Sequence, residues 1–127
     1  MLSAKYSQMI TLRRVYDREA PGEGYKVLVD RLWPRGISKE KAGWSEWIKD
    51  VAPSDNLRKW YSHDPDKWDR FRLMYKEELR DKEEILARLR QLEAEHGTLT
   101  LLYSSKEEKI NNAVALREFL MHPGMEK

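Results

Sequence analysis

The chain has 127 residues, of which 40% are hydrophobic, and its 24 basic and 22 acidic residues leave a net charge of +2. This composition is typical of one globular domain, and the near balance of charge does not favour a protein that binds nucleic acid mainly by electrostatics. The sequence has no cysteine, which excludes disulfides, thiolate nucleophiles and cysteine-ligated metal sites.

The sequence gives no sign of membrane insertion or export. No apolar stretch approaches the length of about eighteen residues that a membrane helix needs. The first residues, 1–6, lack the apolar segment and cleavage pattern of a signal peptide. We therefore expect a cytoplasmic protein with no membrane partner, whose core covers about residues 8–121 and whose short ends are flexible.

The first part of the chain predicts short strands separated by turns. Residues 8–15 and 25–30 carry the apolar and β-branched residues of strands, and their connection is too short for a helical crossover. Two arrangements stay open: an antiparallel neighbouring pair, or parallel strands that are separated in the sheet. Ser38 is expected to cap a short helix over 39–42, before a third strand over 44–51.

The middle of the chain predicts helices. Ser54 is expected to cap a short helix that runs to Tyr61. Asp64 as N-cap and Pro65 at the first helical position then begin the next helix. An amphipathic stripe continues that helix and consists of Trp68, Phe71, Tyr75 and Leu79.

The last part of the chain predicts a helix, a strand and a helix. A capping-box pattern at 81–84 begins a helix that Gly97 ends. Residues 98–103 are strongly strand-like, and a capping-box pattern at 105–108 places a helix N-terminus directly after them. The final helix extends to about Met121. Together these elements predict an α/β fold: a single compact domain with a small mixed or mostly parallel sheet of about four strands packed by helices.

Three blocks of the sequence resemble a known family. They are VDRLWPRG at 29–36, APSDNLRKWYSHDP at 52–65, and LLYSSK with the later NNAVAL within 101–116. These blocks resemble the YeaO-like family of small uncharacterised bacterial proteins, domain of unknown function family 488, over nearly the whole chain. The resemblance implies a compact α/β fold and a cytosolic bacterial protein, and it implies no established reaction.

Polar residues follow the second predicted strand at the point where it ends. In open α/β sheets ligands bind at this edge, which here carries Asp30, Arg31, Trp33 and Arg35. Two guanidinium groups suit a phosphate or carboxylate, with Asp30 orienting one of them and Trp33 as a stacking wall. The structural alternative is an ion pair that closes the loop after the strand.

A second group consists of Arg58, His63 and Asp64. His63 is a candidate proton donor or acceptor because histidine titrates near physiological pH. The plainer interpretation makes Asp64 an N-cap and His63 only the residue before it. Tyr16 and Asp17, at the end of the first predicted strand, would join the same cleft if that strand points the same way.

Ser104, Ser105 and Lys106 form a third group, between a strand and the N-terminus of the helix predicted after it. Free N–H groups and the helix dipole favour an anion there, and Lys106 adds a positive charge. The alternative is capping alone. Asn111 and Asn112 lie within the predicted helix that follows, and they face either the same cleft or solvent. The three histidines lack the spacing of metal ligands, so neither a metal nor another cofactor is expected.

The leading hypothesis is a cleft at the strand ends that binds a small anionic or phosphorylated ligand. Its expected ligand-binding residues are Arg31, Trp33, Arg35, Arg58, Ser104, Lys106 and Asn111. If the protein is an enzyme, His63 or Asp30 would be the acid–base group. Two alternatives stay open: a nucleic-acid-binding module that stacks bases on Trp33 or Trp60, and a protein-interaction domain anchored by exposed tryptophans.

Overall fold

A computed structural model describes residues 9–122, which form a four-stranded sheet packed by helices. The strands are β1 (Met9–Arg14), β2 (Tyr25–Leu28), β3 (Glu46–Trp47) and β4 (Thr98–Tyr103). Every pair is parallel, and the order is β1-β4-β2-β3. The predicted α/β class is therefore confirmed. The flexible ends expected from the sequence lie outside the described residues.

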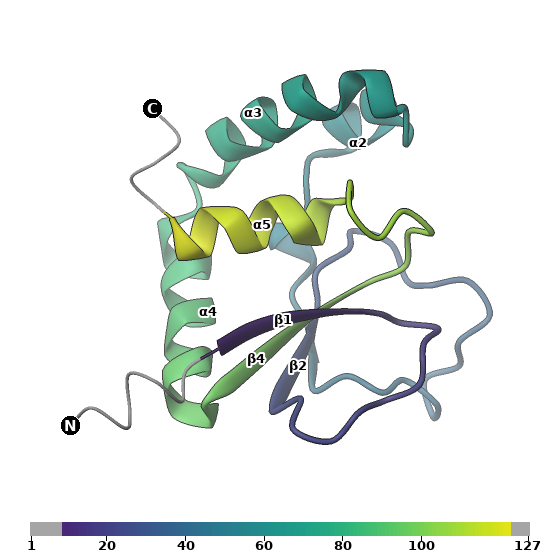
Figure 1. Ribbon diagram of the computed structural model, residues 1–127, viewed down its shortest axis with the longest axis vertical. Helices are drawn as coiled ribbons and strands as arrows, with labels where there is room; N and C mark the ends of the chain where they lie inside the picture. The colour runs from purple at the N-terminus through teal and green to yellow at the C-terminus, as the bar shows by residue number, and fades with distance from the viewer. Residues whose placement is uncertain (1–8, 123–127) are drawn as a thin grey trace.

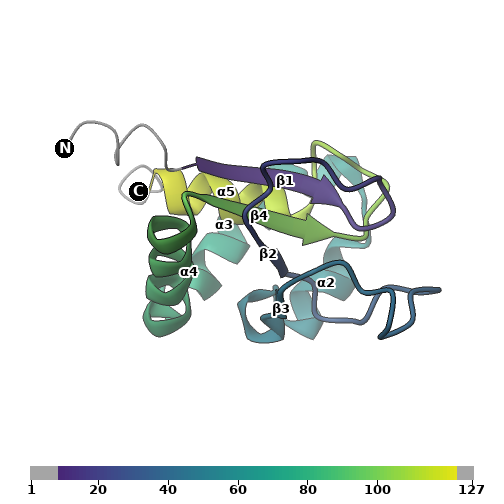
Figure 2. The ribbon, with the colours of Figure 1, turned by 90° about the horizontal axis from the view of Figure 1, so that it is seen from below.

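The helices come mainly between β3 and β4. They are η1 (Lys49–Val51) and η2 (Pro65–Lys67), both 3₁₀-helices, and α2 (Asp55–Tyr61), α3 (Trp68–Leu79), α4 (Glu83–His96) and α5 (Asn112–Met121). Figures 1 and 2 place α3 and α5 on the same side of the sheet. Among residues 9–122, none of the helices combines the length and hydrophobicity that a membrane span requires.

The two faces of the sheet are covered in different ways. Side chains alternate along each strand, so Val27 and Leu101 face the helices and join the hydrophobic core. Leu28 and Leu102 point to the opposite face, where they are also almost completely buried. Irregular segments after β1 and β2 cover that second face. The helices therefore lie on one side of the sheet, and irregular segments cover the other side.

The connection from β1 to β2 passes over β4, which lies between them. Its residues, 15–24, reach up to about 33 Å when extended, whereas a six-residue strand is about 20 Å long. No helix is needed for this return. Glu23 fixes the crossing, because its side chain accepts a hydrogen bond from Arg13 Nε at 2.5 Å and its carbonyl accepts one from Thr100 Oγ1 at 2.7 Å. The strands are thus parallel and separated.

Most of the predicted helix boundaries in the middle of the chain are confirmed. Ser54 caps α2, since its Oγ accepts a hydrogen bond from the N–H of Leu57 at 3.2 Å. Asp64 caps η2, with Pro65 as the first residue of that turn. Gly97 ends α4 with a φ of 80°. The apolar stripe of α3 is buried at Phe71, Tyr75 and Leu79, with Trp68 partly buried.

Other boundaries are wrong. No helix forms over 39–42, where the chain makes turns instead, because four residues give too few hydrogen bonds to offset helix nucleation. The strand expected over 44–51 is reduced to β3, because η1 turns the chain away. The capping box at 81–84 is absent: α4 begins after Lys82, whose Nζ donates to the carbonyl of Ala52 at 3.0 Å.

The helix after β4 begins later than predicted. Ser105 does not cap a helix, since its Oγ accepts from the N–H of Glu107 at 3.0 Å and makes a local turn. Asn111 is the N-cap of α5, and its Oδ1 accepts from the N–H of Val114 at 3.0 Å. Residues 104–111 therefore form a loop at the sheet edge instead of a helix.

Gly24 is required where the return connection enters β2. It has a φ of +64°, and a Cβ added to it would lie 2.2 Å from the carbonyl oxygen of Thr98. We expect Gly24→Ala to lower the free energy of unfolding by about 3 kcal/mol or more, because it adds a backbone clash to the left-handed strain. Gly22→Ala, at a φ of +82° with open space around it, should cost only about 1–2 kcal/mol. Urea unfolding of both variants tests this, and equal losses would contradict it.

Candidate functional site

A cleft of about 930 Å³ opens at the carboxyl ends of β1, β2 and β4. Its walls are the segments that follow these strands, together with α2 and the turn after it. The strands are parallel, so their carboxyl ends lie at one edge of the sheet. The cleft is lined by every residue that the leading hypothesis names: Asp30, Arg31, Trp33, Arg35, Arg58, His63, Ser104, Lys106 and Asn111.

Asp30 joins three elements at this edge. Its Oδ2 accepts hydrogen bonds from the N–H of Ser104 at 2.9 Å and from the Oγ of Ser104 at 2.7 Å. Its Oδ1 accepts one from Asn112 Nδ2 at 3.1 Å, and the same amide donates to the carbonyl of Val29 at 3.1 Å. The carboxylate therefore ties the end of β2 to the end of β4 and to the first residue of α5.

Burial raises the pKa of Asp30 above its ordinary value, because the charged form is largely removed from water. The hydrogen bonds from Ser104 and Asn112 and the nearby charge of His63 act in the opposite direction. Within the described residues the partners of this carboxylate are Ser104 and Asn112, not an arginine as the sequence suggested. The geometry gives Asp30 a positioning role, and its use as an acid–base group stays a prediction.

Arg31 is used mainly to hold the loop after β2. Its Nε donates to the carbonyl of Pro53 at 2.9 Å, and its terminal nitrogen donates to the carbonyl of Ala52 at 3.2 Å. Asp55 lies 3.9 Å from the same Nε. Arg31 thus joins this loop to the start of α2, which is close to the structural alternative considered for it.

Trp33 is held by contacts within the protein, although the sequence predicted it as a surface on which a ligand stacks. Its indole N–H donates to the carbonyl of Ile37 at 2.6 Å. The ring makes edge contacts with Trp44 and Trp47, at centroid distances of 5.0 and 5.5 Å. The three half-buried tryptophans form one cluster that supports the wall of the cleft.

Asn111 also has a structural role at the cleft. It is only 2% exposed, its Oδ1 caps α5, and its Nδ2 donates to the carbonyl of Glu107 at 2.6 Å. Both polar atoms of its side chain are therefore engaged by the chain. The neighbouring Asn112 is the residue that reaches Asp30.

Several cations of the cleft have no partner among residues 9–122. Arg35, Lys59 and Lys106 are exposed, and no hydrogen bond or ion pair of their side chains occurs within residues 9–122. Arg58 is half-buried: one terminal nitrogen lies 3.3 Å from an oxygen of Asp55. Its Nε is buried without a hydrogen-bond partner among the described residues. An unpaired buried donor costs about 1–3 kcal/mol, and the Nε atoms of Arg72 and Arg117, which do not line the cleft, are buried and unpaired in the same way.

The turn after α2 places His63 under backbone strain. Ser62 and His63 have φ values of 46° and 60°, in the left-handed region that costs most residues about 1–2 kcal/mol each. Tyr61 anchors the turn: its hydroxyl donates to the carbonyl of Ile110 at 2.7 Å, and burial raises the pKa of Tyr61 to about 12. Such strain is often kept at functional sites. Asp64, by contrast, only caps η2 and does not line the cleft.

Sequence reasoning missed Arg14, which follows the same strand-end rule as Asp30. Its Nε donates to the carbonyls of Ser104 and Ser105 at 3.2 and 2.9 Å, and its guanidinium lies 4.7 Å from the ring centroid of Tyr16. Tyr16 lines the cleft because β1 is parallel to the other strands. Asp17 instead lines a separate cavity of about 80 Å³ over the other face of the sheet.

The cleft is strongly positive. Two acidic side chains, Asp30 and Glu107, line it. Six basic side chains line it: Arg14, Arg31, Arg35, Arg58, Lys59 and Lys106. A concave site lined by one sign of charge concentrates ions of the opposite sign. Within the part of the chain that the structure describes, no cluster of three or more histidine, cysteine, aspartate or glutamate residues could hold a metal.

Sequence comparison places the chain among known proteins. The family description "Inactive DUF488-N3 subclade" matches residues 9–126. The chain belongs to the YeaO-like DUF488 family. It is 41% identical over 111 residues to the uncharacterised protein YeaO of Escherichia coli K12, which covers 87% of this chain and 96% of that relative.

Mycobacterial relatives of this family are equally similar. The chain is 40% identical over 111 residues to the uncharacterised protein Rv3073c of Mycobacterium tuberculosis H37Rv, which covers 87% of this chain and 92% of the relative. The uncharacterised protein Mb3100c of Mycobacterium bovis gives the same identity and coverage. No solved structure matches the chain.

The buried carboxylate of Asp30 should leave a signature in the pH dependence of stability. Its folded-state pKa lies above the ordinary value of 3.8, so the stability that its neutral form contributes is present at low pH and is lost as pH rises through the folded-state pKa. Asp30→Asn cannot ionise and lacks this loss. We expect the unfolding free energy of the wild type minus that of Asp30→Asn to fall as pH rises above the ordinary value of 3.8 and through the folded-state pKa.

Urea unfolding at several pH values measures this difference. Asp81→Asn, at an exposed position, is the matched control for the loss of one carboxylate. A difference between wild type and Asp30→Asn that is constant or that grows with pH would contradict the expectation.

Proposed function

We propose that this protein binds a small anionic ligand, with phosphorylated compounds as the expected class, in the cleft at the strand ends. The observation that carries the proposal is the set of cationic groups without partners among the described residues. Arg35 and Lys106 are exposed to the cleft, and the Nε of Arg58 is buried and unpaired. Anionic oxygens would satisfy these donors with charge-assisted hydrogen bonds.

Binding is better supported than catalysis. Both oxygens of Asp30 already accept hydrogen bonds from Ser104 and Asn112, so His63 is the remaining candidate for acid–base work. The family description that matches the chain calls its subclade inactive. A binding role needs only the cations and the shape of the cleft.

The two alternatives have less support. Both alternatives depend on exposed tryptophans, as stacking platforms for a nucleic-acid strand or as anchors for a protein partner. Trp33, Trp44 and Trp47 are instead half-buried against one another. Trp60 is also partly buried, with the ammonium of Lys67 at 5.0 Å from its ring centroid. The net charge of +2 also gives the chain little general attraction for nucleic acid, so a small ligand is preferred.

A thermal-shift screen tests the proposal, with inorganic phosphate, ribose 5-phosphate, AMP and succinate as probes. A ligand that binds only the folded state at about 100 times its Kd adds about 2.7 kcal/mol, which raises Tm by roughly 5–15 °C. Arg58→Ala should weaken binding of the best probe about tenfold or more, because it removes a charge-assisted contact. Arg35→Ala should act in the same direction.

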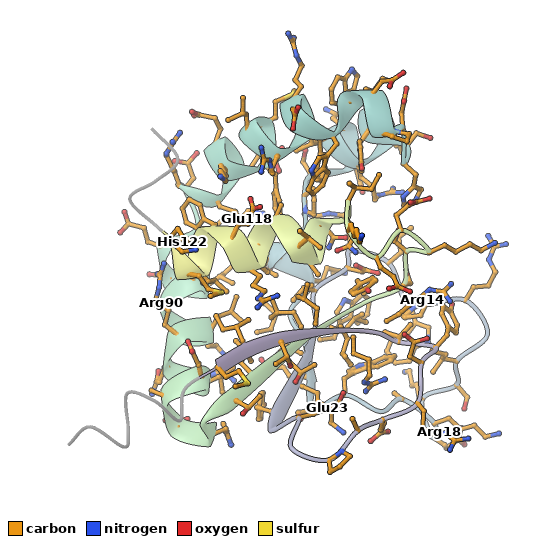
Figure 3. The ribbon with its side chains drawn as sticks, in the orientation of Figure 1. Arg14, Arg18, Glu23, Arg90, Glu118 and His122 are labelled. Carbon is orange, nitrogen blue, oxygen red and sulfur yellow. The ribbon has the colours of Figure 1, made fainter. Side chains whose placement is uncertain are left out.

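Arg90→Ala is the matched control. Arg90 is exposed on α4, and Figure 3 shows it at the opposite end of the molecule from Arg14, whose side chain lines the cleft. Its removal changes the net charge equally and should leave probe binding unchanged. Equal effects of Arg58→Ala and Arg90→Ala, or no shift with any probe, would overturn the proposal.

A further inference from the structure

The cleft has an apolar wall that phosphate binding alone does not need. Tyr16 is 44% exposed and Leu32 is 56% exposed, and both line the cleft. They are among the exposed large hydrophobic side chains of residues 9–122. Small-ligand sites commonly combine apolar walls with a few polar groups that orient the ligand. The wall therefore points to a ligand with an apolar part beside its anionic part.

The ring of Tyr16 is held in a fixed position. Its hydroxyl donates to the carbonyl of Arg35 at 2.6 Å, and the guanidinium of Arg14 lies 4.7 Å from its centroid. Arg14 is itself held by the carbonyls of Ser104 and Ser105. One side of the ring is thus supported while much of the side chain stays exposed. A flat ligand ring could stack on it with little loss of side-chain freedom.

The stacking surface is next to the unpaired cations. The bond from Tyr16 to the main chain of Arg35 brings the ring to the loop that carries Leu32 and Arg35. Lys106 follows the same two carbonyls that hold Arg14. An aromatic surface and positive charges therefore occur together on this side of the cleft, with Arg58 on α2 as a further cationic group.

We propose that the ligand is a nucleoside phosphate, with its base stacked on Tyr16 and its phosphate held by Arg35, Lys106 and Arg58. This inference rests on the proposed function and specifies its ligand class. The volume of about 930 Å³ lies within the range of about 300–1,000 Å³ found for small-ligand sites, which includes a mononucleotide. Stacking on an aromatic side chain tolerates any base, because every base has a π-face.

The test compares four probes by isothermal titration calorimetry: AMP, CMP, ribose 5-phosphate and adenosine. We expect the tighter of AMP and CMP to bind at least about tenfold more tightly than ribose 5-phosphate, which lacks the base. Tyr16→Leu should remove that advantage and leave the affinity for ribose 5-phosphate unchanged. Tyr16→Phe keeps the ring and should retain most of the advantage of the nucleotide over ribose 5-phosphate. Arg58→Ala should weaken the binding of both the nucleotide and the sugar phosphate.

Each result decides between the two claims. If ribose 5-phosphate binds as tightly as the nucleotides, and Tyr16→Leu changes neither, the nucleotide inference is wrong and anion binding stands. If adenosine binds as tightly as AMP and Arg58→Ala has no effect, or if no probe binds, both claims fail. Leu73→Ala, at an exposed hydrophobic position on α3, is the control for Tyr16→Leu, and melting temperatures show that each variant is folded.

Discussion

The hydrogen bonds of the Asp30 carboxylate are the interaction on which the cleft depends. They join β2, β4 and α5, three elements that are far apart in the sequence. Because the carboxylate is largely out of water, each of these bonds is stronger than at the surface, and leaving any partner unpaired would be costly. The same network holds the loop after β4 against the loop after β2, so the two main walls of the cleft keep a fixed spacing.

The parallel sheet explains why so many cations meet at one edge. All four strands point the same way, so the segments after β1, β2 and β4 begin side by side. This arrangement requires the chain to return from the end of β1 to the start of β2 through a connection that contains no helix. Gly24, with its positive φ and its close approach to Thr98, and the pairing of Arg13 with Glu23 make that return possible.

The basic and aromatic residues of the cleft divide into two groups by their partners. Arg31 and Trp33 give their donors to main-chain carbonyls and build the walls. Arg35, Lys106 and the Nε of Arg58 have no such partners within residues 9–122. Arg35 and Lys106 are exposed cations that the described chain does not pair, so this second group is where we propose that the anion binds. Residue type alone does not separate the two groups, because arginine occurs in both.

The sequence by itself determined the features that depend on neighbouring residues. The caps at Ser54 and Asp64 and the glycine end of α4 follow from local backbone preferences, and the polar residues after β2 pointed to the edge of the sheet where the cleft opens. Only the tertiary structure decided that Asn111 and not Ser105 caps α5. It also decided that Asp30 accepts hydrogen bonds from Ser104 and Asn112, and that Arg14 and Tyr16 line the cleft. These depend on contacts between segments distant along the chain, whose energies exceed the small differences in local propensity.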